Sequence, residues 1–214
     1  MNIMSDTIKW WLVYGSVRTG TTLLCRQIAS CSRRQISDWG LWPTVFLEVH
    51  EADYVKFDKE RAYRDMSSNL LDNAYKTGGT QLDLVYKQAN MEFVEYEALK
   101  RLWGEPEKTI FCIRDPAGYI VSAEKKFPEW TDQQREEWYV RNFDVYEKIG
   151  GDIFEYHPDL TSEDIVSFIH PLQIDKNDRI AFQYRGAMDS SKTTALMCSS
   201  FDKFKETYQD IINL

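Results

Sequence analysis

The sequence predicts an α/β protein of three layers, in which helices cover both faces of a central parallel sheet. Short apolar runs alternate with helical patterns along the chain, and this alternation is typical of parallel sheets. The first run, "IKWWLVYG", is apolar on both faces, as a buried parallel strand requires. A glycine-containing turn and a helix follow it, which is how phosphate-binding βα units begin. The 214 residues suffice for one large core, so we expect a single domain over residues 1–214.

The N-terminal part supplies the first βαβ pattern and then a less regular stretch. The strand at residues 8–15 is followed by apolar residues at helical spacing, which predict a helix at 21–31. The run "RRQIS" predicts a short second strand at 33–37. The polar, aromatic-rich stretch at about residues 40–80, with a helix near 58–76, is interpreted as a cap segment on the substrate side.

Two further strands flank an amphipathic helix. The runs "LDLVYK" and "KTIFCIRD" predict strands, the first at residues 82–87. The stretch "MEFVEYEALKRLWG" between them predicts a helix that Gly104 closes. Asp115 is expected to cap the next helix, "PAGYIVSAEKKF", with Pro116 as its first residue.

The C-terminal part continues the alternation. Thr131 and Gln134 have the spacing of a capping box and predict the start of a long helix that ends at Gly150. A strand, "DIFEYH", and a helix, "TSEDIVSFIHPL", that ends near Pro171 are expected next. A loop, "AFQYRGAMDSSKTT", and a last helix, "FDKFKETYQDIINL", complete the chain.

Composition bounds the functions open to this chain. It carries 26 basic and 34 acidic residues, a formal net charge of −8, which argues against general binding to nucleic acid or to a membrane surface. Any bound anion must therefore be captured by a local site. The four cysteines show no metal-binding spacing and are interpreted as buried, reduced thiols. The sequence shows neither a signal-peptide pattern nor an apolar run of about 18 residues, so we expect a cytoplasmic protein. We expect it to be a monomer or a homodimer.

The turn "VYGSVRTGTT" after the first strand has the outline of a phosphate-binding loop, G-x-x-x-x-G followed by hydroxyl residues. Its glycines allow successive backbone N–H groups to point at one anion, and the helix that begins near Thr21 adds its positive end. A loop that hydrolyses ATP would carry lysine at position 21, so that charge is missing. Arg18 supplies a charge from the near side of the loop, where its planar fork suits a tetrahedral oxyanion.

Two motifs carry a resemblance to one enzyme family. The loop "GSVRTGTTLL" resembles the 5′-phosphosulfate loop of the sulfotransferases that use 3′-phosphoadenosine 5′-phosphosulfate (PAPS). The stretch "IFCIRDPAGYIVSAEKKF" resembles the 3′-phosphate motif of the same family, which implies Arg114 and Ser122 at the 3′-phosphate and a P-loop-like sulfotransferase fold. A nucleotide with phosphates on both sides needs two separated cationic sites, whereas ATP needs one. For the 5′-phosphosulfate, the resemblance implies contacts from Ser16, Arg18, Thr19, Gly20, Thr21 and Thr22.

Two later stretches extend the resemblance. "FEYHPDLTSEDIVSFIHPL" is similar to a strand and helix of the family. The matching residues are Tyr156, Asp159 and Leu160. "YRGAMDSSK" resembles the late R-x-G loop that closes over the 3′-phosphate, which implies Arg185 and Gly186, although Tyr184 stands where an arginine is often found. The resemblance does not cover residues 40–80 or so, where acceptor recognition would lie.

The resemblance also implies a reaction. A sulfonate group would pass from PAPS to a hydroxyl or amine of a small-molecule acceptor, with release of adenosine 3′,5′-bisphosphate. Arg18 stands at the place of the family's catalytic lysine or arginine and would stabilise charge on the leaving phosphate. No metal is expected, because positive side chains and a helix end would carry the charge. Lys87 resembles a lysine often found at the end of its strand and would contact the transferred group or the acceptor.

The general base is left open among three residues. Asp38 lies eighteen residues past the second glycine of the loop, where some sulfotransferases carry a carboxylate, but it also suits a cap of the turn "SDWG". Glu48 and His50 in the cap segment are the alternatives, whereas His157 and His170 are interpreted as structural. Aromatic residues of the cap segment suggest an apolar or ring-containing acceptor. These are Trp39, Trp42, Phe46, Tyr54 and Phe57.

Two other functions stay open on the sequence. The first is a P-loop nucleotide kinase or hydrolase with Asp115 as its Mg²⁺ carboxylate, against which the missing lysine at Thr21 counts. The second is a catalytically inert protein of the same fold that binds PAPS or another nucleotide.

Overall fold

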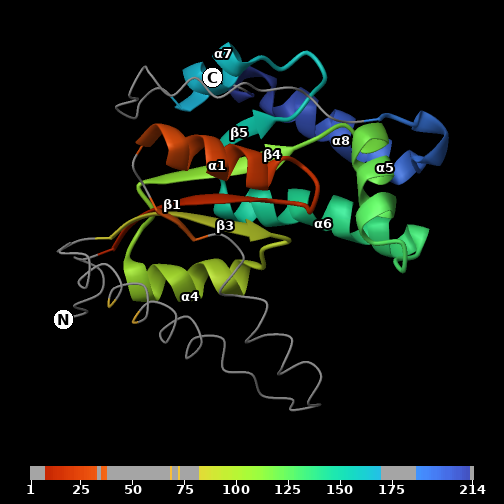
Figure 1. Cartoon of the computed structure of the whole chain (residues 1–214). Helices are drawn as coiled ribbons and strands as arrows, with labels where there is room; N and C mark the ends of the chain where they lie inside the picture. Colours follow the sequence, from red (N-terminus) through yellow and green to blue (C-terminus); the bar gives the residue numbers. More distant parts are fainter. Residues whose placement is uncertain are drawn as a thin grey trace.

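The described part of the chain is an α/β domain with a central parallel sheet between two layers of helices, which confirms the predicted fold class (Figure 1). The structure is a computed structural model, and it describes residues 8–32, 35–37, 68, 72, 82–169 and 187–212. The described strands form one sheet in the order β2-β3-β1-β4-β5, and every neighbouring pair is parallel. The strands are β1 (Ile8–Gly15), β2 (Gln35–Ser37), β3 (Leu82–Ala89), β4 (Lys108–Ile113) and β5 (Asp152–Glu155).

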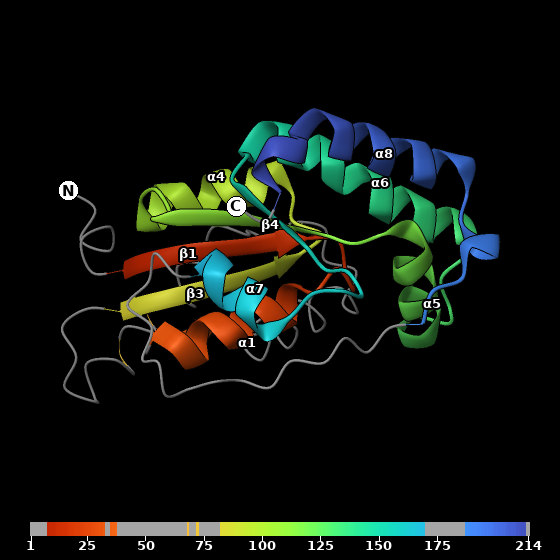
Figure 2. The same ribbon diagram turned by 90° about the horizontal axis from the view of Figure 1, so that it is seen from above.

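Helices cover both faces of this sheet. On one face α1 packs on β2 and β3 and against α7, and on the other face lie α4, α6 and α8, of which α6 and α8 pack together (Figure 2). Helix α5 lies at the end of the sheet toward which β1 and β3 point (Figure 2). The helices are α1 (Thr21–Ser32), α4 (Phe93–Trp103), α5 (Pro116–Lys126), α6 (Asp132–Ile149), α7 (Ser162–Ile169) and α8 (Ala195–Tyr208), with short 3₁₀ turns η2 (Ser190–Lys192) and η3 (Gln209–Ile211).

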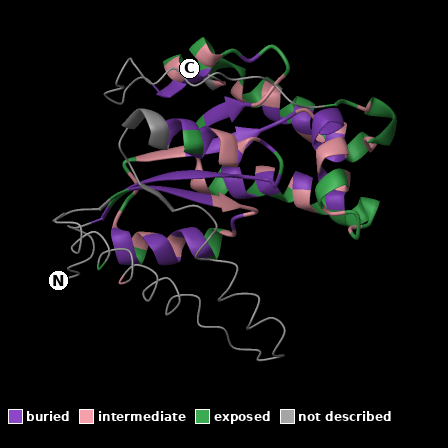
Figure 3. Cartoon of the chain, viewed as in Figure 1, coloured by how far each residue is buried: buried purple, intermediate pink, exposed green. Residues whose placement is uncertain are grey.

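The core explains why β1 reads as a continuous apolar run. Successive strand residues point to opposite faces of the sheet, and both faces of β1 are covered. Trp10, Leu12 and Tyr14 are buried in the cluster that includes α4, α6 and α8, while Trp11 and Val13 are buried in the cluster that includes α1 and α7. The strands are accordingly buried along most of their length (Figure 3).

Helix ends lie where local sequence signals placed them. The Asp115 carboxylate accepts a hydrogen bond of 2.8 Å from the Ala117 backbone N–H, so it caps α5 as predicted. The Thr131 hydroxyl and the Gln134 side chain form the predicted capping box at the start of α6. These caps satisfy backbone N–H groups that have no partner inside a helix. Gly104 and Gly150 follow the last residues of α4 and α6, both with a positive φ angle.

Several boundaries differ from the sequence prediction. Strands β4 and β5 end at Ile113 and Glu155, two residues before their predicted ends. The last helix begins at Ala195 instead of residue 201, because the Thr194 hydroxyl accepts a hydrogen bond from the Met197 N–H and caps an earlier first turn. Strand β3 continues two residues beyond Lys87, and both residues pair with the end of β1. The predicted helix at 58–76 and the end near Pro171 lie outside the described residues.

Candidate functional site

The sheet order creates a crevice at the carboxyl ends of β1 and β3. The two strands are neighbours, but the chain leaves β1 for α1 on one face and leaves β3 for α4 on the other. The loops that follow them therefore diverge, and ligands of doubly wound sheets bind at such a switch point. The glycine loop at residues 16–20 lies here, at the start of α1.

The loop has a backbone conformation that only part of its sequence favours. Gly20 has φ 95° and Arg18 has φ 69°, a left-handed conformation that costs a residue other than glycine roughly 1–2 kcal/mol. The hydroxyl of Thr19 donates a hydrogen bond of 2.7 Å to the Ser16 carbonyl and closes the turn. Backbone strain of this kind often marks a functional loop, and here it falls on the arginine that the sequence singles out.

Asn90, which follows β3, holds the first half of the loop. Its backbone N–H donates to the Gly15 carbonyl at 2.7 Å, and its side-chain oxygen accepts from the Val17 N–H at 3.1 Å. The same oxygen lies 3.5 Å from the Ser16 hydroxyl. Asn90 itself has φ 57°, a conformation that asparagine tolerates better than most residues. The sequence analysis missed this residue, for which only its position after the strand would have been a signal.

The second motif meets the loop directly. The Nη1 of Arg114 donates a hydrogen bond of 3.2 Å to the Arg18 carbonyl, and the Nε of Arg18 donates one of 2.9 Å to the Ser122 hydroxyl. The two motifs, which lie about a hundred residues apart in sequence, are thus neighbours at one crevice. Arg114 is buried, and the Tyr139 hydroxyl donates to its carbonyl. The Arg114 guanidinium thus binds the backbone of the loop. The contact of Arg114 with a 3′-phosphate stays a prediction.

Tyr156 packs against both motifs. Its ring lies 5.1 Å from the Arg114 guanidinium, in cation–π range, and its backbone N–H donates to the Ile113 carbonyl. A Cβ atom on Gly20 would lie 3.1 Å from the Cβ and Cγ atoms of Tyr156, so the ring closely underlies the second glycine of the loop. The sequence analysis noted Tyr156 only as a match to a family pattern. The structure shows that it packs against the loop.

The electrostatics of the loop favour an anion. The Arg18 side chain is exposed at one edge, yet the surrounding protein partly desolvates it, and this lowers its pKa from the ordinary value. The positive charge of Arg114 lowers the pKa of Arg18 further, whereas Tyr156 raises it slightly. Two neighbouring cations repel each other, and an anion placed between them would relieve that repulsion.

A cavity of about 250 Å³ opens beside the loop. Lys87 is buried on the α1 face of β3, and its Nζ lies 3.0 Å from the Thr22 hydroxyl oxygen in the first turn of α1. Among the described residues, the lining includes four cationic side chains and no carboxylate, although the chain as a whole is acidic. The lining residues are Val17, Arg18, Thr21, Thr22, Arg26, Lys87, Ala89, Lys126 and Phe127.

Two of these cations were missed by the sequence analysis. Arg26 lies one helical turn after Thr22 on α1, and Lys126 lies one turn after Ser122 on α5. Residues four apart share one face of a helix, so this spacing was the signal that could have found them. Each helix thus brings a hydroxyl and a cation to the same side.

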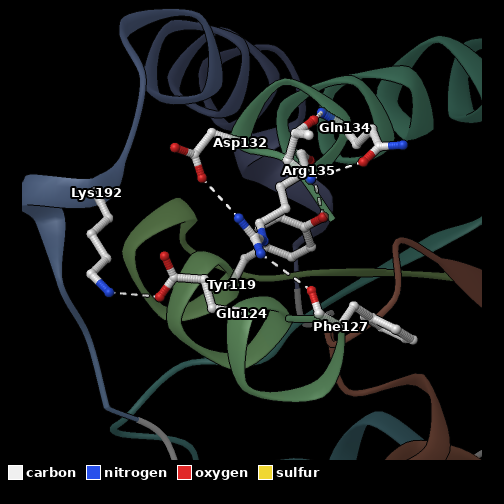
Figure 4. A network of polar contacts seen from close by, with 8 residues as sticks. Tyr119, Glu124, Phe127, Asp132, Gln134, Arg135 and Lys192 are labelled. Atoms are coloured by element: carbon white, nitrogen blue, oxygen red, sulfur yellow. Dashed lines mark hydrogen bonds and ion pairs between the residues drawn. The ribbon is translucent and has the colours of Figure 1, made fainter. Parts of the chain in front are cut away.

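A polar network fixes the end of α5 that carries Lys126 (Figure 4). Arg135 of α6 is buried, and its guanidinium donates to the Asp132 carboxylate at 2.8 Å and to the Phe127 carbonyl at 3.2 Å. Lys192 pairs with Glu124 of α5 at 2.6 Å (Figure 4). The last turn of α5 is therefore held to α6 and to η2, which keeps Lys126 at the cavity.

The late part of the chain also returns to this site. The Asp189 backbone N–H donates a hydrogen bond of 3.2 Å to the Ala117 carbonyl in the first turn of α5. The predicted 3′-phosphate residues Arg185 and Gly186 lie outside the described residues, just before this contact. Also outside the described residues lie the predicted bases and substrate contacts, Asp38, Glu48 and His50.

The described residues offer no group of three or more metal-ligating side chains that could hold an ion. Asp115, the carboxylate of the kinase alternative, is engaged as the cap of α5. No helix among the described residues is long and apolar enough to cross a membrane.

Comparisons with known proteins give similarity at the level of solved structures alone. No protein-family model matches the chain, and no curated protein matches it. A shikimate kinase from Bacteroides thetaiotaomicron is 13% identical over 94% of this chain and 98% of that chain, with a TM-score of 0.40. A shikimate kinase from Acinetobacter baumannii, in complex with shikimate, is 11% identical over 98% of each chain, with a TM-score of 0.32. An unliganded sugar kinase from Janibacter sp. HTCC2649 is 9% identical over 56% of this chain and 66% of that chain, with a TM-score of 0.38. At these scores the likeness carries no conclusion about ligand or reaction.

Proposed function

We propose that this protein is a PAPS-dependent sulfotransferase. The observation that carries the proposal is the junction at Arg18, whose carbonyl accepts from Arg114 and whose Nε donates to Ser122. One nucleotide with anionic groups at its 5′ and 3′ sides could contact both motifs, because they border the same crevice. The resemblance of these two motifs to the 5′-phosphosulfate loop and the 3′-phosphate motif supports the same function.

The residues present suit transfer of a sulfonate group. The acceptor oxygen or nitrogen would form a bond to sulfur while the bond between sulfur and the bridging oxygen breaks, and the leaving phosphate would keep the electron pair. Arg18 would stabilise that charge, together with the positive end of α1 and the hydroxyls of Thr21 and Thr22, which line the same cavity. Lys87 would hold an equatorial sulfonyl oxygen from the other side of the cavity. The acceptor's proton would pass to one of the three candidate bases, Asp38, Glu48 or His50.

A ligand-binding experiment tests the proposal. Adenosine 3′,5′-bisphosphate at about 100 times its Kd should stabilise the fold by about 2.7 kcal/mol and raise the melting temperature by roughly 5–10 °C. Adenosine 5′-monophosphate, which lacks the 3′-phosphate, should give a smaller shift. The Ser122→Ala variant should weaken binding of the bisphosphate more than that of the monophosphate, because the monophosphate is affected only through the contact between Ser122 and Arg18. Stabilisation by ATP with Mg²⁺ and none by the bisphosphate would reject the proposal. If the bisphosphate binds but no sulfonate passes from PAPS to any acceptor of a broad panel, the protein would be a catalytically inert nucleotide-binding protein.

A nucleotide phosphotransferase is the second candidate, and the position of Lys87 favours it. Its buried ammonium reaches the Thr22 hydroxyl and could replace the lysine missing from position 21. The same ammonium, however, lies at the hydroxyl that would bind Mg²⁺ in an ATP-hydrolysing loop, so it competes with the metal there. Under this second function, Lys87→Met should abolish the stabilisation by ATP and Mg²⁺, which the same melting experiment measures.

A further inference from the structure

The lining of the cavity includes cationic side chains beyond those that the proposed function assigns to the donor. On the proposed function, the phosphosulfate brings one negative charge on its phosphate and one on its sulfonate. Arg18, Lys87 and the start of α1 would face those two groups. Arg26 and Lys126 lie one turn further along α1 and α5 and line the same cavity.

The lining gives the second pair of cations a distinct environment. Among the described residues, no carboxylate pairs with Lys126, and the cavity wall next to it is apolar at Phe127 and Ala89. Phe127 stacks on Trp130 at 4.3 Å between ring centroids, so a second aromatic ring supports this wall. A positive group beside an aromatic wall suits a molecule with an apolar body and an acidic end.

We propose that the acceptor of this protein carries an acidic group, a carboxylate or a phosphate, that binds Lys126 and Arg26 beside the transferred sulfonate. This inference rests on the proposed function and names the class of its second substrate. The acidic group would fix the acceptor so that its hydroxyl or amine faces the sulfonate on the Arg18 side of the cavity. The apolar part would lie on Phe127.

Binding of three matched phenols tests this inference. The protein is first saturated with adenosine 3′,5′-bisphosphate, so that the loop is occupied, and is then titrated by calorimetry. The probes are 3-(4-hydroxyphenyl)propionate, 4-hydroxybenzylphosphonate and the neutral 4-ethylphenol. We expect at least one of the two anionic probes to bind at least about tenfold more tightly than 4-ethylphenol, as one charge-assisted hydrogen bond predicts. The tighter anion then distinguishes a carboxylate from a phosphate acceptor.

Neighbouring lysines supply a matched pair of variants. Lys126→Gln should weaken binding of the anionic probe about tenfold and leave binding of 4-ethylphenol unchanged. Lys125→Gln removes the same charge from the same last turn of α5 but lies outside the cavity lining, so it should have no effect on either probe. Both side chains are exposed, so melting temperatures close to that of the unchanged protein are expected for both variants.

The outcomes separate this inference from the proposed function. Failure of adenosine 3′,5′-bisphosphate to bind in the first step rejects the function, and the acceptor site falls with it. If the bisphosphate binds but 4-ethylphenol binds as tightly as the anions, only the acidic acceptor is rejected. If the Lys125→Gln and Lys126→Gln variants lose the same affinity for the anionic probe, the acidic acceptor is also rejected, because equal losses would indicate a general surface effect. Weaker bisphosphate binding in Lys126→Gln, with the anionic probe unchanged, would assign the cation to the donor and overturn the inference.

Discussion

The Nε of Arg18 donates a hydrogen bond of 2.9 Å to the hydroxyl of Ser122, which lies 104 residues further along the chain. This contact joins the loop after β1 to the helix after β4. It brings together the two motifs that the sequence singled out independently.

On the proposed function, Arg18→Ala should reduce turnover by about 10²–10³-fold, because it would remove a preorganised positive charge at the leaving phosphate. The measurement is release of adenosine 3′,5′-bisphosphate from PAPS in the presence of a phenol acceptor. The variant should fold normally, since the side chain is exposed. Arg18→Lys keeps the charge and should lose less activity than Arg18→Ala. Turnover unaffected in Arg18→Ala would remove this residue from the catalytic site.

Asn90→Gly should weaken binding of adenosine 3′,5′-bisphosphate about tenfold. Glycine accepts the φ of 57° at this position, so the change mainly removes the side-chain oxygen. That oxygen accepts from the Val17 N–H and the Ser16 hydroxyl in the loop, and from the Asn142 amide of α6. A hydrogen bond of this kind contributes about 1 kcal/mol, with a further cost for a misplaced loop. Calorimetric titration measures the affinity. The control variant Gln88→Gly, two residues earlier in β3, tests whether added flexibility alone produces the loss.

Gly15→Ala and Gly150→Ala should differ strongly in stability. Both glycines have positive φ angles, 152° and 72°, so alanine is strained at each. A Cβ at Gly15 would lie 2.4 Å from the Cys112 carbonyl oxygen, whereas a Cβ at Gly150 meets no atom within 4 Å. We expect a loss of about 1 kcal/mol for Gly150→Ala and roughly 3 kcal/mol or more for Gly15→Ala. Urea denaturation gives both values, and equal losses would contradict the clash.

The fold should lose stability as the pH rises above 10. Burial raises the pKa of Tyr119 and of Tyr146 to about 12. The unfolded chain releases these protons near pH 10, while the folded chain keeps them to about pH 12, so the unfolded state binds fewer protons in that window. Stability therefore falls with pH there, by up to about 1.4 kcal/mol per pH unit for each such tyrosine. Urea denaturation from pH 8 to 11, with phenolate absorbance as a second signal, measures this loss. A free energy of unfolding that stays constant over this pH range would contradict the prediction.

Elements that local sequence signals define could be predicted, and those that depend on distant contacts could not. β1, the glycine loop and the caps at Asp115 and Thr131 all follow from neighbouring residues, and each lies where it was expected. The start of α8 was missed because its cap, Thr194, stands in a run of small polar residues that reads equally well as a loop.

The site was predictable only in part for the same reason. The motifs named Arg18, Arg114 and Ser122, and the structure brings all three together. Their close contact could not be read from sequence, because it depends on β1 and β4 lying side by side. Arg26 lies outside both motifs, and Lys126 lies at the end of the second motif without a role there. Both line the cavity because of their helical spacing and the placement of α1 and α5.

The pairing of β1 with β3 has a consequence for synthesis of the protein. Ile8 of β1 is aligned with Leu82 of β3, which lies 74 residues later in the chain. Strand β1 therefore cannot pair with β3 until those residues have been synthesised. Until β3 has been synthesised, an eight-residue, mostly apolar segment with unpaired backbone groups is exposed in the nascent chain. Chaperone binding early in translation is the expected safeguard, and slow codons before residue 82 would lengthen the period of risk.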